Sequence, residues 1–171
     1  MKNFIFFIFF LFFSKNLLAN DKILYLDVNY LLNNSEVGKY VNSELNKLNE
    51  ENINEFKKIE ENLKVDENKL LKQKNILKEE EYNIKLNELK SKYNSYRKLT
   101  NDKTNELKKL QNGAGEKILK IINNILSDYA TKNEVLLIID KKHVVIGKSQ
   151  LDVTKDIMIL LDDKVKKVEL K

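Results

Sequence analysis

The residues that could do chemistry in this sequence are few and scattered. The chain has one histidine, His143, no cysteine and four glycines among 171 residues. Zinc sites draw on several histidines or cysteines, and a phosphate-binding loop needs closely spaced glycines. His143 follows Lys141 and Lys142 in an expected turn, which is typical of an edge or surface residue. We therefore expect no enzymatic activity, no metal and no cofactor.

Two charged clusters in the middle of the chain could bind ligands. Glu79, Glu80 and Glu81 are consecutive, and neighbouring residues on a helix point to different sides, so their carboxylates do not converge on a cation. The segment 68–78 has no acidic residue and interleaves apolar residues with four lysines: Lys69, Lys72, Lys74 and Lys78. A basic amphipathic segment favours contact with an anionic lipid surface. Lysines that only keep an exposed helix soluble would give the same pattern.

A long helical region must carry both clusters. Residues 39–112 contain neither Gly nor Pro, the two strongest helix breakers. At about 1.5 Å per residue, this region is either one rod of about 110 Å or two arms of about 55 Å. A 4,3 apolar spacing runs through both halves but is interrupted over residues 74–82. We place a reversal there and predict an antiparallel coiled-coil hairpin; a continuous rod remains the alternative.

The predicted seam of this hairpin is narrow. It begins with Val41, Leu45 and Leu48 and stutters at Ile53. Beyond that point the apolar residues that fall seven apart are Phe56, Leu63, Leu70, Leu77 and Ile84. In the second half the 4,3 positions are Tyr82, Leu86, Leu89, Tyr93, Tyr96, Thr100, Lys103, Leu107, Leu110 and Ala114. Gly113 and Gly115 follow this rhythm, and after them we expect a new helix over 116–131 with a broad apolar face.

The two ends of the chain predict a small sheet. Apolar runs at 23–28, 135–140 and 143–147 are typical of strands with both faces buried, and a last helix is expected over 154–166. The helices can cover one face of this three-stranded sheet, so we infer that the other face meets copies of the same chain. The residues expected in this oligomerisation body are Ile23, Tyr25, Leu137, Ile139, Val144 and Ile146.

The first twenty residues predict export. Lys2 precedes an apolar run from Phe4 to Phe13, and Ala19 and Asn20 follow in a more polar segment. This order is typical of a secretory signal peptide, cleaved here near Ala19 or Asn20. The expected organisation is a signal peptide at 1–20, a body from 21–38 and 113–171, and an arm at 39–112 with its tip near 74–82. Net charge is only +5, so a nucleic-acid partner is not expected.

The order of these elements resembles the Skp (OmpH-like) family of periplasmic chaperones. The resemblance is carried by Lys22-Ile-Leu-Tyr-Leu-Asp-Val28, the Gly- and Pro-free arms, Leu136-Leu-Ile-Ile-Asp140, Val144-Val-Ile146 and Asp152-Val-Thr-Lys-Asp-Ile157. It implies a mostly helical α+β fold, a homotrimer built through the small sheet, and a periplasmic location. It also implies an ATP-independent holdase that binds unfolded outer-membrane proteins between its arms. No lipopolysaccharide-binding set of residues is matched, and none is carried over.

On this interpretation, sparse apolar residues of the arm contact the client. The expected contacts are Leu63, Leu70, Ile76, Leu77, Tyr82 and Tyr93. The alternative is a structural coiled-coil spacer or adaptor of the cell envelope without chaperone activity.

Overall fold

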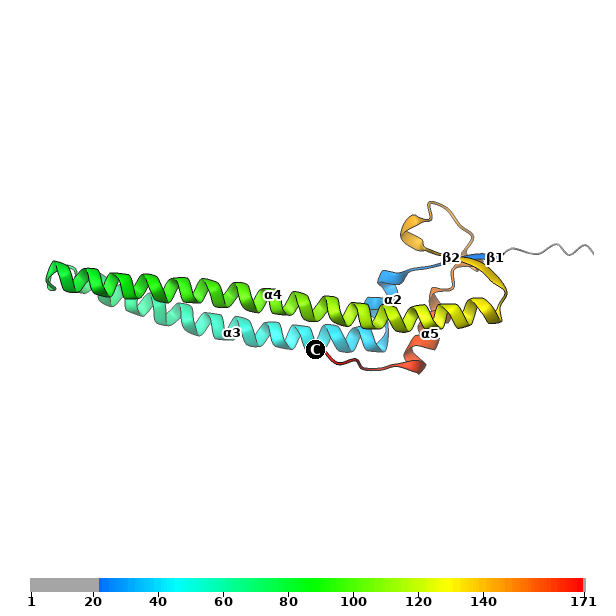
Figure 1. Ribbon diagram of the computed structural model, residues 1–171, viewed down its shortest axis with the longest axis horizontal. Coiled ribbons are helices and arrows are strands. Elements are labelled where there is room, and N and C mark those ends of the chain that lie inside the picture. The colour runs from blue at the N-terminus through cyan, green and yellow to red at the C-terminus, as the bar shows by residue number, and fades with distance from the viewer. Residues whose placement is uncertain (1–21, 171) are drawn as a thin grey trace, which may run out of the picture.

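A long helical hairpin projects from a small body of helices and strands (Figure 1). The computed structural model describes residues 22–170. The expected signal peptide and its cleavage site near Ala19 or Asn20 lie outside the described residues. The mostly helical α+β class, with a hairpin inserted into a small sheet domain, is confirmed.

The hairpin consists of α3 (Glu36–Gln73) and α4 (Glu79–Lys132). Their 38 and 54 residues correspond to about 57 Å and about 81 Å of helix. The chain reverses at residues 74–78, where the amides of Ile76 and Leu77 both donate to the carbonyl of Gln73 at 3.0 Å. One continuous rod over 39–112 is therefore wrong.

The narrow seam holds the two helices together. All ten 4,3 positions from Tyr82 to Ala114 are buried or half-buried. On α3 the matching positions include Val41, Leu63 and Leu70, which are buried. The rings of Phe56 and Tyr96 meet edge-to-face across the seam, with centroids 6.2 Å apart. Most residues between the seam positions are exposed, as expected for a two-helix coiled coil.

The helix predicted to begin after Gly113 and Gly115 is not a separate element. α4 passes through both glycines and ends only at Lys132. A Cβ at either glycine would meet nothing within 4 Å, so neither marks a turn or a close approach. Each glycine costs about 1 kcal/mol relative to alanine, and burial of neighbouring Ala114 and Ile118 offsets this. One helix therefore runs from the arm tip to the far end of the body.

The base of the arm is fixed by a close approach between α2 (Val28–Asn34) and α3. Asp27 caps α2, and buried Ser35 caps α3 by accepting a hydrogen bond of 3.1 Å from the amide of Gly38. A Cβ at Gly38 would lie 2.0 Å from the backbone oxygen of Leu32. Only glycine fits here, because the obstacle is backbone rather than a movable side chain.

The sheet has two parallel strands among the described residues, β1 (Lys22–Leu26) and β2 (Val135–Asp140). The third strand predicted at 143–147 does not form. Residues Lys141–His143 and Ser149–Leu151 are short 3₁₀ turns, with a loop between them. Asp152 instead bridges to Tyr25, whose carbonyl accepts the amide of Val153 at 2.9 Å. At Tyr25, therefore, β1 is bridged by the segment before α5 and not by a third strand.

The core lies between the sheet, the base of the hairpin and α5 (Thr154–Lys164). The broad apolar face predicted on the second half of α4 is confirmed, since Ile118, Ile122 and Ile125 are buried. Their partners in the cluster include Leu24, Leu26, Leu31, Val37, Val41, Ile157 and Leu161.

Candidate functional site

One face of the sheet turns away from the core. In the parallel register Ile23 pairs with Leu137, and Tyr25 pairs with Ile139. Paired residues in a sheet share a face, and the alternate residue of β1, Leu24, is buried in the core. Ile23 and Leu137 are accordingly exposed, while Tyr25 and Ile139 are half-buried. These four side chains, predicted for the oligomerisation body, lie together on the face opposite the helices.

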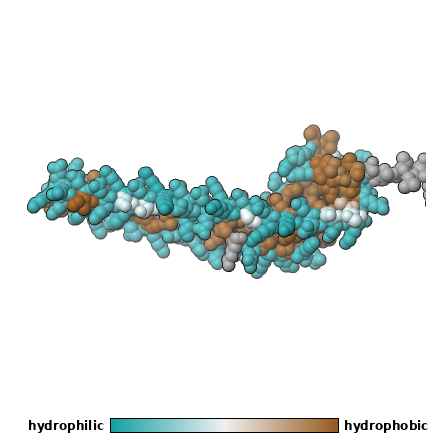
Figure 2. Space-filling view, in the orientation of Figure 1, coloured by the Kyte–Doolittle hydropathy of each residue, from teal (hydrophilic) through white to brown (hydrophobic). Residues whose placement is uncertain are grey.

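The loop after β2 enlarges this face. Val145 and Ile146 are 102% and 92% exposed, and Leu136, at a register shift in β2, is also exposed. Gly147 lets the loop approach Tyr25, because a Cβ there would lie 2.8 Å from the tyrosine ring. Figure 2 shows apolar surface over this end of the body. We call this surface the open apolar face; it comprises Ile23, Leu137, Val145 and Ile146.

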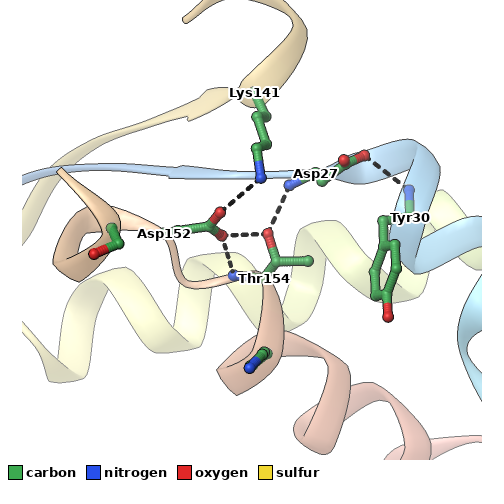
Figure 3. A pocket seen from close by; sticks show the side chains of 7 residues that line it. Asp27, Tyr30, Lys141, Asp152 and Thr154 are labelled. Atoms are coloured by element: carbon green, nitrogen blue, oxygen red, sulfur yellow. Dashed lines mark hydrogen bonds and ion pairs between the residues drawn. The ribbon is translucent and has the colours of Figure 1, made fainter. Parts of the chain in front are cut away.

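A polar junction holds the loop to the body (Figure 3). Thr154 Oγ1 accepts the amide of Asp27 at 2.9 Å and donates to Asp152 Oδ1. Lys141 Nζ donates to Asp152 Oδ2 at 2.9 Å, so both carboxylate oxygens are engaged. The junction borders a cavity of about 370 Å³, next to Tyr30. It ties β1, the loop and α5 together.

Charge pairing in this junction shifts two pKa values. Burial opposes ionisation of Asp152, but hydrogen bonds from Thr154 and Lys141 outweigh it and lower the pKa of Asp152. The hydrogen bond to Asp152 raises the pKa of Lys141. Both groups are charged at neutral pH, and we interpret the junction as a structural clasp for the loop that carries Val145 and Ile146.

The arm presents isolated apolar side chains outside its seam. Ile76 at the reversal is 79% exposed and Leu71 is 58% exposed. Five large apolar side chains of the hairpin are exposed in this way. We call them the arm apolar set: Ile53, Val65, Leu71, Ile76 and Ile84. Ile53, Val65 and Ile84 have polar or charged neighbours on both sides in the sequence. Figure 2 shows only small apolar areas along the face of the arm that it draws. Val65 and Leu71 fall outside the predicted seam positions, whereas Ile84 was counted among the seam residues seven apart, and its exposure corrects that placement.

The six residues predicted to contact clients differ in their exposure to solvent. Leu63 and Leu70 are 4% and 6% exposed, so they hold the hairpin together and offer almost no surface to a client. Their placement as client contacts is corrected for this reason. Tyr82 and Tyr93 are half-buried in the seam, Leu77 is half-buried at the reversal, and Ile76 is exposed.

Polar pairs reinforce the outer half of the seam. Lys92 Nζ lies 2.6 Å from Asp66 Oδ2; this hydrogen bond lowers the pKa of Asp66 and raises that of Lys92. The hydroxyl of Tyr93 donates to Glu67 at 3.2 Å, and that of Tyr96 donates to Glu60. All of these groups are exposed or half-buried, so each pair is worth little alone. Their joint effect is to set the register of α3 against α4.

The basic end of the arm is exposed. Lys69, Lys72, Lys74 and Lys78 all face solvent at or near the reversal. Glu79, Glu80 and Glu81 form the first turn of α4, where acidic residues favour the positive end of the helix dipole. The tip therefore presents both signs of charge within a few residues.

The described part of the chain gives no sign of a metal centre or a membrane span. Within residues 22–170, no group of three or more His, Cys, Asp or Glu side chains could hold a metal ion. Among the same residues, no helix has the length and apolar character needed to cross a bilayer.

Comparison with known proteins identifies a family and a similar fold. A sequence model of the family described as outer membrane protein (OmpH-like) matches residues 22–161. The fold is similar to that of a Caulobacter crescentus CB15 protein provisionally assigned as an OmpH-like outer membrane chaperone. The TM-score is 0.79, with 16% identity over 86% of this chain and 88% of that one. At this identity the likeness concerns the fold alone. No curated protein matches the chain.

Proposed function

The chain belongs to the OmpH-like outer membrane protein family, and from this premise we propose that it is a periplasmic holdase chaperone. It would bind unfolded outer-membrane proteins, prevent their aggregation, and act without ATP. The assignment of the Caulobacter protein as a chaperone supports this role.

The observation that carries the proposal is the arm apolar set. Its five side chains are the large apolar residues that the hairpin exposes most, on a surface rich in charged and polar residues. An unfolded chain offers exposed apolar residues at irregular spacing, and each can meet one arm residue. The five side chains are spread along the arm, so each contact with a client is small and can exchange.

Retention of the client then depends on the number of contacts. Linked weak sites raise the local concentration of the client at each further site, so overall binding is strong although each contact is short-lived. Release needs no nucleotide chemistry, because a client that folds buries the residues that the arms contact.

The open apolar face supports self-association. Ile23, Leu137, Val145 and Ile146 are exposed apolar side chains of a small body. Covering a large apolar side chain is worth roughly 1.5–3 kcal/mol. We propose that copies of the chain meet here as a homotrimer, the number that the family resemblance implies, and that three arms surround one client.

Two further parts of the proposal concern the envelope. Export through the predicted signal peptide would place the chain in the periplasm. The basic end of the arm, with Lys69, Lys72, Lys74, Lys78 and exposed Ile76, would contact anionic lipid headgroups.

The experiment dilutes a urea-unfolded outer-membrane β-barrel protein into buffer with the purified chain and follows light scattering, with no nucleotide present. We expect scattering to fall to baseline near one trimer per client. A matched variant with Leu71, Ile76 and Ile84 changed to Ser should need several-fold more protein. Undiminished aggregation with the unchanged chain would favour the spacer alternative.

A further inference from the structure

The chain does not stop at the last helix. Residues 165–170 leave the end of α5, whose last turn bonds to the amide of Val165, and run back along the base of the arm (Figure 1). They form neither helix nor strand. Three of them, Val165, Val168 and Leu170, are half-buried and pack against the core cluster. An extended peptide is therefore seated on a folded surface.

The surface beneath this segment contacts it in three chemically different ways. Lys166 Nζ lies 3.2 Å from Glu36 Oε2. Lys167 Nζ lies 5.2 Å from the centre of the Tyr40 ring, a cation–π distance. Lys117 Nζ donates to the main-chain carbonyl of Glu169 at 2.7 Å. Two of the contacts come from α3 and one from α4, so the segment spans both helices of the hairpin.

These contacts define an acceptor for extended polypeptide. The apolar anchors need only a Val or Leu every two or three residues, and the carboxylate and the ring each accept a lysine. The bond from Lys117 reaches the main chain, which every sequence provides. None of the contacts depends on a unique side chain. The ion pair is exposed on both partners and is therefore worth little by itself.

The segment lies beyond the region that the family model matches. The family match ends at residue 161, and Leu161 is the last fully buried core residue. Residues 165–170 therefore add a covering to a face that the matched region already forms.

We propose that this face, formed by Glu36, Tyr40 and Lys117, binds extended apolar and basic segments of unfolded clients, and that residues 165–170 occupy it as a built-in competitor. The identity of the client rests on the function proposed above. A tethered segment has an effective concentration of about a millimolar, so a weak free peptide does not displace it. A client that is held at several points along the arm can displace the segment. The face therefore becomes available only when the arms have bound a client.

The test uses a fluorescently labelled peptide of residues 163–170 as the probe and fluorescence anisotropy as the readout. A variant that ends at Lys164 should bind this peptide at least tenfold more tightly than the full chain. In the shortened variant, Tyr40→Ala should weaken peptide binding several-fold, whereas Tyr30→Ala, at an exposed tyrosine of α2 that makes none of these contacts, should not change it. Equal affinities for the shortened and full chains would overturn the proposal.

A second variant covers the case in which shortening unfolds the body. Full-length chain carrying Val168→Asp and Leu170→Asp keeps its length but loses two anchors. If its circular dichroism and thermal midpoint match the unchanged chain, peptide binding should rise as in the shortened variant. A stable double variant without that rise would mean that the segment is not a competitor.

The light-scattering assay on the full chain distinguishes the two proposals. Suppressed aggregation without peptide binding to either variant overturns the acceptor face alone. Peptide binding without suppressed aggregation overturns the holdase function and leaves the acceptor face standing.

Discussion

Replacing Leu70 by alanine should loosen the outer half of the arm, whereas the same change at neighbouring Leu71 should not. The two leucines differ in one respect that matters, since Leu70 is 6% exposed in the seam and Leu71 is 58% exposed outside it. The pair therefore separates the side chains that build the arm from those that are available to a client.

The magnitude follows from the packing around Leu70. Leucine-to-alanine changes in cores cost about 2–5 kcal/mol, depending on how well the site collapses. Leu70 borders an open groove of about 230 Å³ between α3 and α4, shared with Leu89 and Lys92, so the lower end applies. A loss of about 2 kcal/mol raises the population of the opened outer arm about 30-fold.

Hydrogen exchange at neutral pH measures this opening directly. Amides of residues 60–72 and 84–98 should exchange about 30-fold faster in Leu70→Ala, with those around Ile122 unchanged. Leu71→Ala should leave protection unchanged but weaken client binding about fivefold, because roughly 1 kcal/mol of apolar burial is lost. Unchanged exchange in Leu70→Ala, or faster exchange in Leu71→Ala, would refute the assignment of the seam.

Three further changes test other parts of the molecule. Gly38→Ala should destabilise the chain by about 3 kcal/mol in urea unfolding, because the new methyl meets the backbone of Leu32; a change below about 1 kcal/mol would mean that the approach is not tight. Ile146→Asp should shift the mass measured by light scattering toward the monomer, while Ile53→Asp on the arm should not; an unchanged oligomer in Ile146→Asp would place the interface elsewhere. Because the folded-state pKa of Asp152 is lowered, its stabilisation is full above its unfolded value of about 3.9 and is lost as pH falls through the folded value. Asp152→Asn should therefore destabilise the chain at pH 6 more than at pH 3 in thermal melts, and an equal effect at both values would exclude the clasp.

The hairpin could be predicted from the sequence because its seam has a strict rhythm. Residues Tyr82 to Ala114 at 4,3 spacing are all buried or half-buried, and the interruption near 74–82 contains the reversal at 74–78. Periodicity reports which residues share a face, and a coiled coil has only one face to bury. Leu63 and Leu70 are seven apart in the first half of the arm, so the pattern predicted that they are buried in the seam. Their interpretation as client contacts did not follow from that pattern.

The third strand could not be excluded from the sequence. Val144, Val145 and Ile146 have the composition of a buried strand, but two of them are almost fully exposed in a loop. A surface suited to meeting another copy has the composition of a core, and composition alone does not say which chain covers it. The pairing of Asp152 with β1 gave no signal, because a single bridge has no periodicity.

The prediction that a new helix begins after Gly113 and Gly115 was wrong for a physical reason. Gly113 and Gly115 weaken a helix without stopping it, and the packing of Ala114 and Ile118 against the body decides the outcome. Gly38, by contrast, is required by a close approach that only the folded backbone reveals. The covering of the arm base by residues 165–170 likewise depends on tertiary position, and no local pattern pointed to it.

The central claim is that unfolded clients contact the exposed apolar residues of the arm. A photo-reactive side chain placed at Leu71 or Ile84, compared with one at Ile159 on α5, tests it most directly. Both arm positions should crosslink to a urea-diluted outer-membrane protein and should stop doing so once that protein is folded in detergent. Equal crosslinking from Ile159, or crosslinking from the arm that persists with the folded protein, would contradict the account.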